Sequence, residues 1–185
     1  MNFVLTTARL ILRAPVESDL AALAAAINSR RIVENTATIP WPYGPNDALY
    51  YLQRARSAGP GTLRLRIERQ DRPGEIAGGI GIEASDRRQD AELGYWLAEP
   101  SWAKGFGFEA AHAVTGYAFE VIGHERLVAG YRHGNEASRR ILNRLGFRHV
   151  EHRRNWARGI GTYVPVARLE LSRREWLQQS QPDAP

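Results

Sequence analysis

Apolar and polar residues alternate along several stretches of this chain. A period of two places successive side chains on opposite faces, which predicts a strand with one buried face. The alternation falls at residues 63–67, 76–82, 91–97, 127–131 and 164–171, and residues 9–13 and 147–152 are two further predicted strands. The pattern therefore predicts a sheet of six to seven strands.

In four further stretches apolar residues recur every three or four positions, which predicts four helices. Ser18 is the predicted N-cap of the first helix, and Asn46 or Asp47 that of the second. The third helix runs from Phe108 to Ile122, and the fourth begins at Asn135. The apolar positions that define the helices are Leu20, Leu23, Ala24 and Ile27; Leu49, Leu52 and Ala55; Ala111, Val114, Ala118 and Phe119; and Ile141, Leu142 and Leu145.

The order of these elements predicts an α/β (α+β) fold. Residues 71–74, Asp-Arg-Pro-Gly, form a turn sequence between two strands, so the pair is a predicted hairpin. A third strand follows, and the later strands alternate with helices. We therefore expect a mixed, mostly antiparallel sheet with helices on both faces. The apolar period slips after Val166, which predicts a β-bulge near Ala167 or Arg168.

The composition limits the class of protein. With 185 residues and 43% hydrophobic content, the chain can build one sizeable core, so we expect one domain over residues 1–179 and a disordered tail over 180–185. No apolar run approaches the ~20 residues that span a bilayer, and we expect a cytoplasmic protein with no membrane partner. The absence of cysteine excludes disulfides, thiolate metal sites and cysteine nucleophiles.

A basic, glycine-bearing turn leads into the third predicted helix. Residues 102–110 read Trp-Ala-Lys-Gly-Phe-Gly-Phe-Glu-Ala. A helix start offers unpaired N–H groups and the positive end of a dipole, and glycines let a phosphate approach the backbone. The turn is therefore a candidate pyrophosphate site, although an ordinary strand-to-helix turn without a ligand has the same sequence pattern.

A second segment favours the phosphate interpretation. Residues 135–138 read Asn-Glu-Ala-Ser, and Leu-Gly-Phe follows at 145–147. Together the two segments resemble the GNAT superfamily of acyl-CoA-dependent N-acetyltransferases, specifically its RimJ/RimL-like branch. The resemblance extends to Ala8–Arg13, to Glu92–Leu97 and to Arg173–Trp176, and so covers nearly the whole chain.

The resemblance implies acetyl-CoA as cosubstrate, with its pantetheine arm in a cleft where strands 91–97 and 127–131 splay apart. Trp102 departs from the basic residue that many relatives carry, while Lys104 keeps a cation beside the diphosphate. Asn135 is equally explained as a helix N-cap. The residues implied in cofactor binding are Tyr95, Trp96, Leu97, Trp102, Lys104, Gly105, Phe106, Gly107, Phe108 and Asn135.

Two residues are candidates for proton transfer. Many GNAT members place a tyrosine acid where this chain has Leu142, so the resemblance implies that the Ser138 hydroxyl protonates the leaving CoA thiolate. Glu92 is the candidate base for the amine, with an exposed strand-end carboxylate as the alternative. The histidines lack metal-ligand spacing with carboxylates, and we expect no metal.

The reaction implied is direct attack of a neutral amine on the thioester. A protein N-terminal α-amine is the first candidate acceptor, with a small amine (polyamine, amino acid or aminoglycoside) as the alternative and a non-catalytic acyl-CoA-binding protein as a third. Trp41 and Tyr43 form either a lid over the acceptor or anchors of their proline-rich loop. The sequence is compatible with a monomer or a homodimer.

The net charge of +5 comes from 25 basic and 20 acidic residues that are scattered along the chain, so we expect no specific nucleic-acid partner. The densest basic group overlaps residues 153–162, which are predicted to form a glycine-containing loop. It is either a solvated surface or a patch for the 3′-phosphate of CoA or an acidic partner. Its members are Arg148, His149, His152, Arg153, Arg154 and Arg158.

Overall fold

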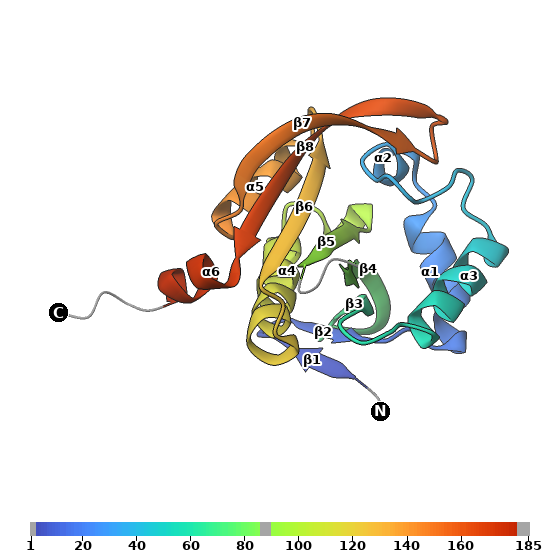
Figure 1. Ribbon diagram of the computed structural model, residues 1–185. Coiled ribbons are helices and arrows are strands. Elements are labelled where there is room, and N and C mark those ends of the chain that lie inside the picture. Colours follow the sequence, from blue (N-terminus) through green and yellow to red (C-terminus); the bar gives the residue numbers. More distant parts are fainter. Residues whose placement is uncertain (1–2, 86–89, 181–185) are drawn as a thin grey trace.

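The computed structural model describes residues 3–85 and 90–180, which are built around one eight-stranded sheet (Figure 1). The strand order is β1-β2-β3-β4-β5-β6-β8-β7, and only β5 and β6 run parallel. This confirms the predicted mixed, mostly antiparallel sheet and its β3–β4 hairpin, but the prediction of six to seven strands missed the short edge strand β1. The strands are β1 (Val4–Thr6), β2 (Leu10–Arg13), β3 (Leu63–Arg69), β4 (Arg72–Ala84), β5 (Asp90–Leu97), β6 (Arg126–Arg132), β7 (Arg148–Ala157) and β8 (Thr162–Ser172).

Helices cover both faces of the sheet, as predicted. The first three helices pack on one face around a core that includes Tyr43 and Ile76. The fourth and fifth pack on the other face in the main core, which includes Phe119 and Leu127 (Figure 1). The helices are α1 (Leu20–Ile27), α2 (Arg30–Val33), α3 (Pro45–Arg56), α4 (Phe106–Tyr117), α5 (Glu136–Arg144) and α6 (Arg173–Ser180); a π-helical turn, Ala118–Ile122, extends α4.

Two predicted helix caps were wrong. Ser18 lies inside a 3-10 turn that precedes α1 and does not cap it. The second predicted helix, α3, begins at Pro45, and its N-cap is Gly44 rather than Asn46 or Asp47. The Asp47 carboxylate accepts the backbone N–H of Gly44 at 3.1 Å. Proline at the first helical position fixes the backbone there, so this helix starts earlier than its apolar period shows.

A buried ionic cluster ties α1 to β2 and β3. Asp19, just before α1, accepts hydrogen bonds from Arg13 and from the backbone N–H of Val16, each at 2.8 Å. Arg66 is 2% exposed and forms ion pairs with both Asp19 and Glu68. Burial opposes the charge of Asp19, but the Arg13 and Val16 hydrogen bonds and the Arg66 charge together lower its pKa below the ordinary value.

Strand β8 changes its buried face along its length. Val166 and Ala167 are adjacent and both buried, but they belong to different hydrophobic clusters. The bulge predicted near Ala167 or Arg168 is present opposite Arg168 and Leu169 in the pairing of β8 with β7, but β8 itself pairs with β6 without a register shift. The irregularity lies in the neighbouring strand β7, between His149 and Glu151.

The β7–β8 hairpin is longer than expected. Most of residues 153–162, predicted as a loop, are strand. The turn of the hairpin docks on the segment around α2 (Figure 1). There the backbone N–H of Arg158 donates to the carbonyl of Ala37 at 2.8 Å, and a Cβ at Gly159 would overlap the side chain of Val33. The hairpin therefore spans from the sheet edge to the helices of the opposite side.

Helix α6 is the last element of the described chain. Ser180, expected in the disordered tail, is the last residue of this helix, and residues 181–185 lie outside the described residues. Within residues 3–85 and 90–180, no helix has the length and apolar character needed to cross a membrane.

Candidate active site

Strands β5 and β6 separate partway along their length. Their parallel pairing runs from Asp90 with Arg126 to Leu93 with Ala129, and no pair between described residues continues beyond that point. The rest of β5, residues 94–97, pairs only with β4, while β6 continues beside β8. This confirms the predicted splay and leaves residues 94–97 of β5 without a partner strand on one edge, where backbone groups other than the Leu97 carbonyl can meet a ligand.

The glycine turn delivers a helix start next to this open edge. Gly105 is the N-cap of α4 with a left-handed φ of 82°, and Ala103 is also left-handed. The first N–H with a partner in the helix is that of Glu109, which donates to the Gly105 carbonyl at 3.1 Å. The amides of residues 105–108 are thus the unpaired donors that every helix start presents, and Lys104 lies exposed beside them. The helix begins two residues before the predicted Phe108.

Gly107 brings three elements into contact. A Cβ at this position would lie 2.9 Å from Cδ1 of Ile141 in α5 and 3.3 Å from Cδ1 of Leu97 in β5. Both distances are shorter than an ordinary carbon contact, so only glycine lets α4 approach β5 and α5 this closely. The helix start is therefore held against the open edge by packing.

An ion pair absent from the predictions fixes the same turn. The Glu109 carboxylate accepts hydrogen bonds from Thr7 Oγ1 at 2.7 Å, from the Arg9 backbone N–H at 2.8 Å and from Arg9 Nε at 2.6 Å. Arg9 Nη1 also donates to the Lys104 carbonyl at 3.0 Å. Burial opposes the charge of Glu109, but the hydrogen bonds lower its pKa below the ordinary value. Arg9 and Glu109 both lie in segments that carry the family resemblance. Because 100 positions separate them, the sequence did not indicate that they form a pair.

The hydroxyls of Tyr95 and Ser138 meet beside the splay, 2.9 Å apart. Both side chains are largely buried, and burial raises the pKa of Tyr95 to about 12 even though the Ser138 hydrogen bond acts in the opposite direction. The phenol therefore keeps its proton at neutral pH. Asn135 caps α5 as predicted, with Oδ1 accepting the Ser138 N–H at 3.1 Å. The prediction assigned Tyr95 a role through its backbone, and missed this side-chain contact.

Four aromatic side chains at predicted cofactor positions are engaged elsewhere in the fold. The Trp102 indole donates to the Leu97 carbonyl at 2.8 Å, and Trp96 lies over Gly79 in β4. Phe106 is buried in the main core, and Phe108 packs beneath an arginine. Any contribution of Phe106 to ligand binding thus comes from its backbone. The cofactor-binding roles assigned from the sequence stay predictions.

A cavity of about 70 Å³ lies on the opposite face of β5 from Tyr95. Glu92 lines this cavity. It points away from Tyr95, three residues later, because successive residues of a strand point to opposite faces. The Glu92 side chain is exposed and forms no ion pair with any described residue. The other lining residues come from the segment after α2, from β6 and from the β7–β8 hairpin: Glu34, Asn35, Thr36, Ala37, Gly130, Tyr131, Arg132, Arg153, Asn155, Val164 and Val166.

Trp41 and Tyr43 do not line this cavity. Tyr43 is buried in the core under α1 and α3, and burial followed by the nearby charge of Asp47 raises its pKa to about 12. Trp41 is 42% exposed. The interpretation of an anchor fits Tyr43, and the part of either residue in acceptor binding stays a prediction.

The predicted basic group does not form one patch. Arg153 lines the cavity, whereas its neighbour Arg154 points to the other face of β7 and donates to the Tyr163 carbonyl at 2.9 Å. Arg148 pairs with Glu175 at 3.2 Å. Alternation along β7 therefore divides these cations between two surfaces.

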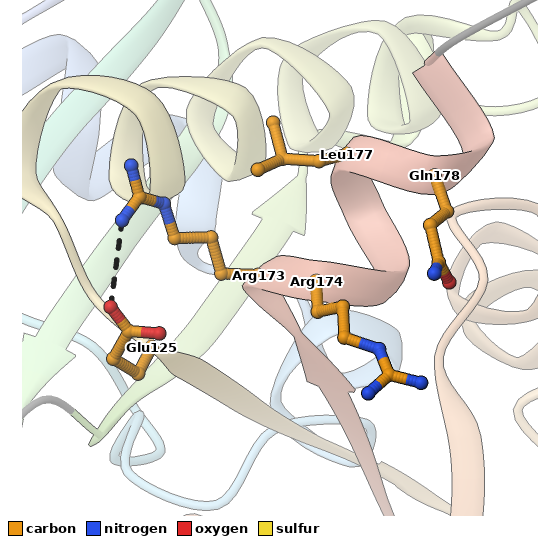
Figure 2. Close-up of a pocket in the computed structure, with 5 residues that line it drawn as sticks. All are labelled: Glu125, Arg173, Arg174, Leu177 and Gln178. Carbon is orange, nitrogen blue, oxygen red and sulfur yellow. Dashed lines mark hydrogen bonds and ion pairs between the residues drawn. The ribbon is translucent and has the colours of Figure 1, made fainter.

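A larger, open depression of about 330 Å³ lies where α6 meets the segment before β6 (Figure 2). Figure 2 shows Arg173 reaching toward Glu125, 3.5 Å away, while Arg174 extends in another direction. No residue predicted to bind or react lines this depression. Since its polar groups do not converge, we place the site at the splay.

The comparison with known proteins identifies the family. The model of the acetyltransferase (GNAT) domain matches residues 9–148. YoaA of Bacillus subtilis, an uncharacterized N-acetyltransferase, is 31% identical over 150 residues, which cover 78% of this chain and 82% of YoaA. The chain belongs to the GNAT acetyltransferase family. This confirms the resemblance that the glycine turn and the Asn135 segment indicated.

Two further GNAT proteins place the chain among its relatives. YdaF of Bacillus subtilis, named as a proposed ribosomal N-acetyltransferase, is 31% identical over 104 residues, 56% of this chain and 57% of YdaF. The crystal structure of spermidine N-acetyltransferase from Vibrio cholerae, in complex with CoA and spermine, matches with a TM-score of 0.77 at 18% identity, over 92% of this chain and 99% of that one. At this identity the second match shows a common fold.

As a GNAT protein, the chain is an acyl-CoA-dependent acetyltransferase and its acyl donor is acetyl-CoA. The groups at the glycine turn fit that donor. The unpaired amides of residues 105–108 and the exposed ammonium of Lys104 suit a diphosphate, and the open edge of β5 suits the amides of a pantetheine arm.

Proposed function

We propose that this acetyltransferase acts on the α-amine of a protein N-terminus. The observation that carries the proposal is the separation of β5 and β6 past Leu93 and Ala129. The α4 start and the Tyr95–Ser138 pair lie on one side of the open edge, and the Glu92 cavity lies on the other. An acyl donor from the first side and an amine from the second therefore meet at the gap.

Acetyl-CoA, when bound, supplies an acyl group activated as a thioester. The chain's own residues have three tasks: to hold the amine against the acyl carbon, to take one proton from the amine and to give one to the departing sulfur. Backbone N–H groups on the open edge of β5 are the donors available to polarise the thioester carbonyl. No nucleophilic side chain is required, consistent with a chain that contains no cysteine.

Ser138 gives the proton to the sulfur. Its hydroxyl is placed by the first turn of α5 and is hydrogen-bonded to the protonated phenol of Tyr95. Because the phenol holds its proton at neutral pH, it can donate to Ser138 while Ser138 donates onward. The pair thus takes the role of the tyrosine that many GNAT members have where this chain has Leu142, which is buried in the main core.

Glu92 takes the proton from the amine, directly or through water. The weakness of a carboxylate base favours an α-amine: with a pKa near ~7.7–8.0, it costs only about 1–1.4 kcal/mol to neutralise at pH 7, whereas a lysine side chain costs roughly 4.6 kcal/mol. The name of YdaF, which proposes a ribosomal substrate, supports the same acceptor class.

A matched panel of amines tests the proposal by release of free CoA thiol. A peptide with a free N-terminus and no lysine should be a substrate, and the same peptide with a blocked N-terminus and one internal lysine should not. Glu92→Gln should lower kcat with the free-N-terminus peptide by about 10-fold to 100-fold. Turnover of the lysine peptide or of spermidine in preference would contradict the N-terminal acceptor, and CoA binding without turnover of any amine would favour the non-catalytic alternative.

A further inference from the structure

We propose that the acceptor carries a carboxylate a few bonds from its reacting amine, and that Arg132 and Arg153 bind this carboxylate in the Glu92 cavity. The inference rests on the proposed function, since it describes the acceptor of the same site. It goes further in naming a charge that the acceptor must bear and the two residues that select it.

The sheet register places the two arginines on one face. Arg132 of β6 pairs with Val166 of β8, and Val166 pairs in turn with Arg153 of β7. Residues directly opposite across neighbouring strands share a face, so both guanidinium groups flank Val166 on the cavity side. Asn155, which pairs with Val164, adds an amide to the same face.

These two arginines are not neutralised within the protein. Three other arginines of these strands have carboxylate partners: Arg126 pairs with Asp90 and Glu170, Arg148 with Glu175, and Arg168 with Glu151, while Arg154 on the opposite face donates to a backbone carbonyl. Among the described residues, neither Arg132 nor Arg153 forms an ion pair. Of the two carboxylates that also line the cavity, Glu34 pairs with Arg30 at 2.9 Å and Glu92 lies on β5, so the two arginines give their own end of the cavity a positive potential.

The hydrogen bonds of the two side chains point to a ligand. Arg132 Nη1 donates to the carbonyl of Glu34 at 2.7 Å, which holds its guanidinium at the segment after α2. Arg153 Nε is buried and has no hydrogen-bond partner. A buried donor of a charged group is costly to leave unpaired, so an acceptor oxygen from a ligand is the expected partner. A carboxylate fits best, because its two oxygens match the planar fork of arginine.

The charges of the cavity are ordered along its length. Glu92 lies on β5 in the last paired stretch, two residues before the edge opens at residue 94, and the two arginines lie on β6 and β7 beyond the point where the pairing of β5 and β6 ends. A volume of about 70 Å³ leaves room for a compact group. A molecule with an amine at one end and a carboxylate a few bonds away complements this arrangement, whereas a polyamine places its second cation against the arginines.

Two sources supply this chemistry: a peptide N-terminus followed by an acidic residue, or a free amino acid. The test compares peptides that begin Ser-Glu, Ser-Gln and Ser-Lys and are otherwise identical, together with free glutamate. We expect kcat/KM for the Ser-Glu peptide to exceed that for Ser-Gln by about 10-fold or more, chiefly through KM. Isothermal calorimetry of the Ser-Glu peptide with the CoA-loaded protein gives a binding readout that does not depend on turnover.

Arg153→Gln should bring the Ser-Glu to Ser-Gln ratio close to one, and Arg153→Glu should shift the preference to Ser-Lys. The matched control is Arg154→Gln, an adjacent cation on the opposite face of β7, which should keep the wild-type ratio. Circular dichroism confirms that each variant is folded.

A wild-type enzyme that treats the three peptides alike, or binds Ser-Gln as tightly as Ser-Glu, overturns the inference while leaving N-terminal acetylation intact. Acetylation of free glutamate with refusal of every peptide keeps the carboxylate inference and overturns the protein N-terminus as acceptor. An unchanged peptide ratio in Arg153→Gln removes the assignment of Arg153.

Discussion

The two sides of the open β5 edge differ in the kind of group that they present: main chain on one side and side chains on the other. On the side of α4, the groups that we propose meet the acyl donor belong mostly to the main chain: unpaired amides, a left-handed Gly105 and the close approach at Gly107. On the other side, the cavity is lined by side chains from three separate segments. Backbone geometry suits a donor that is the same throughout the family, while side chains suit an acceptor that can differ from one member to the next.

A side chain at Gly107 is expected to cause the largest loss of acetyl-CoA affinity on the α4 side. Gly107→Asp forces contact with Ile141 and Leu97 and adds a negative charge to the first turn of the helix whose start we propose binds the diphosphate. We expect acetyl-CoA affinity to fall by about 100-fold or more in calorimetry, which corresponds to roughly 2.7 kcal/mol. Unchanged affinity would end the assignment of the diphosphate to this helix start.

A matched control separates this effect from a general response to losing a glycine. Gly59→Ala changes a glycine that has an ordinary backbone angle and no neighbouring atom within 4 Å of the added Cβ. Its acetyl-CoA affinity should equal that of the wild type. Lys104→Ala, which keeps the backbone intact, should weaken binding by about 10-fold or less, because it removes one exposed cation.

The Tyr95–Ser138 pair tests how protons are transferred at the gap between β5 and β6. Ser138→Ala should lower kcat by about 10-fold to 100-fold with little change in the affinity for acetyl-CoA. Tyr95→Phe keeps the ring and removes only the hydrogen bond, so its effect on kcat should be smaller, about 3-fold to 10-fold. A double variant no worse than Ser138→Ala alone shows that the phenol acts through the serine; additive losses would mean that the two hydroxyls act independently.

The smallest effect concerns stability in acid. Asp19 anchors the acceptor side and Glu109 the cofactor side, and the pKa of each is lowered in the folded protein. A lowered folded pKa gives stability that is present above the unfolded value and lost as pH falls through the folded one. Asp19→Asn and Glu109→Gln should each flatten the fall in unfolding free energy below about pH 4, as measured by urea denaturation.

Acetyl-CoA binding distinguishes these two variants. Glu109→Gln should weaken it by several-fold, because the carboxylate fixes the glycine turn through Thr7 and Arg9. Asp19→Asn should leave it unchanged, since the Asp19 cluster holds α1 on the other face. Equal loss of affinity in both would contradict the division of the site into two independently supported sides.

The division also explains what could be predicted from the sequence. Seven of the strands, the hairpin and the helix start at the glycine turn follow from local periodicity or from a contiguous motif, and the structure contains them. The splay followed from the family resemblance and not from periodicity. The Arg9–Glu109 and Tyr95–Ser138 contacts join residues far apart in the chain, so no local pattern indicates them. Periodicity also misplaced the bulge, because it registers a change of buried face in β8 and carries no information about the partner strand.

The cavity residues show the same limit most clearly. The sequence analysis placed Arg153 and Arg154 in one basic group. Only the register of β7 against β8 shows that their side chains lie on opposite faces of the sheet. Arg132 attracted no attention, because a single arginine at the end of a predicted strand has no distinguishing pattern. Pairing across strands, which depends on the whole sheet, decides which of these cations meets the cavity.

The contact of Gly159 with Val33 fixes the position of the β7–β8 turn, and this position affects the size of the cavity. The turn packs against α2 and the segment after it. The length of the hairpin therefore determines where its cavity-lining residues lie relative to Glu92. Lengthening or shortening this turn by one or two residues would alter the size of acceptor admitted while the grip on the acyl donor stayed the same. In this architecture, a new specificity is within reach of a small insertion at a single hairpin tip.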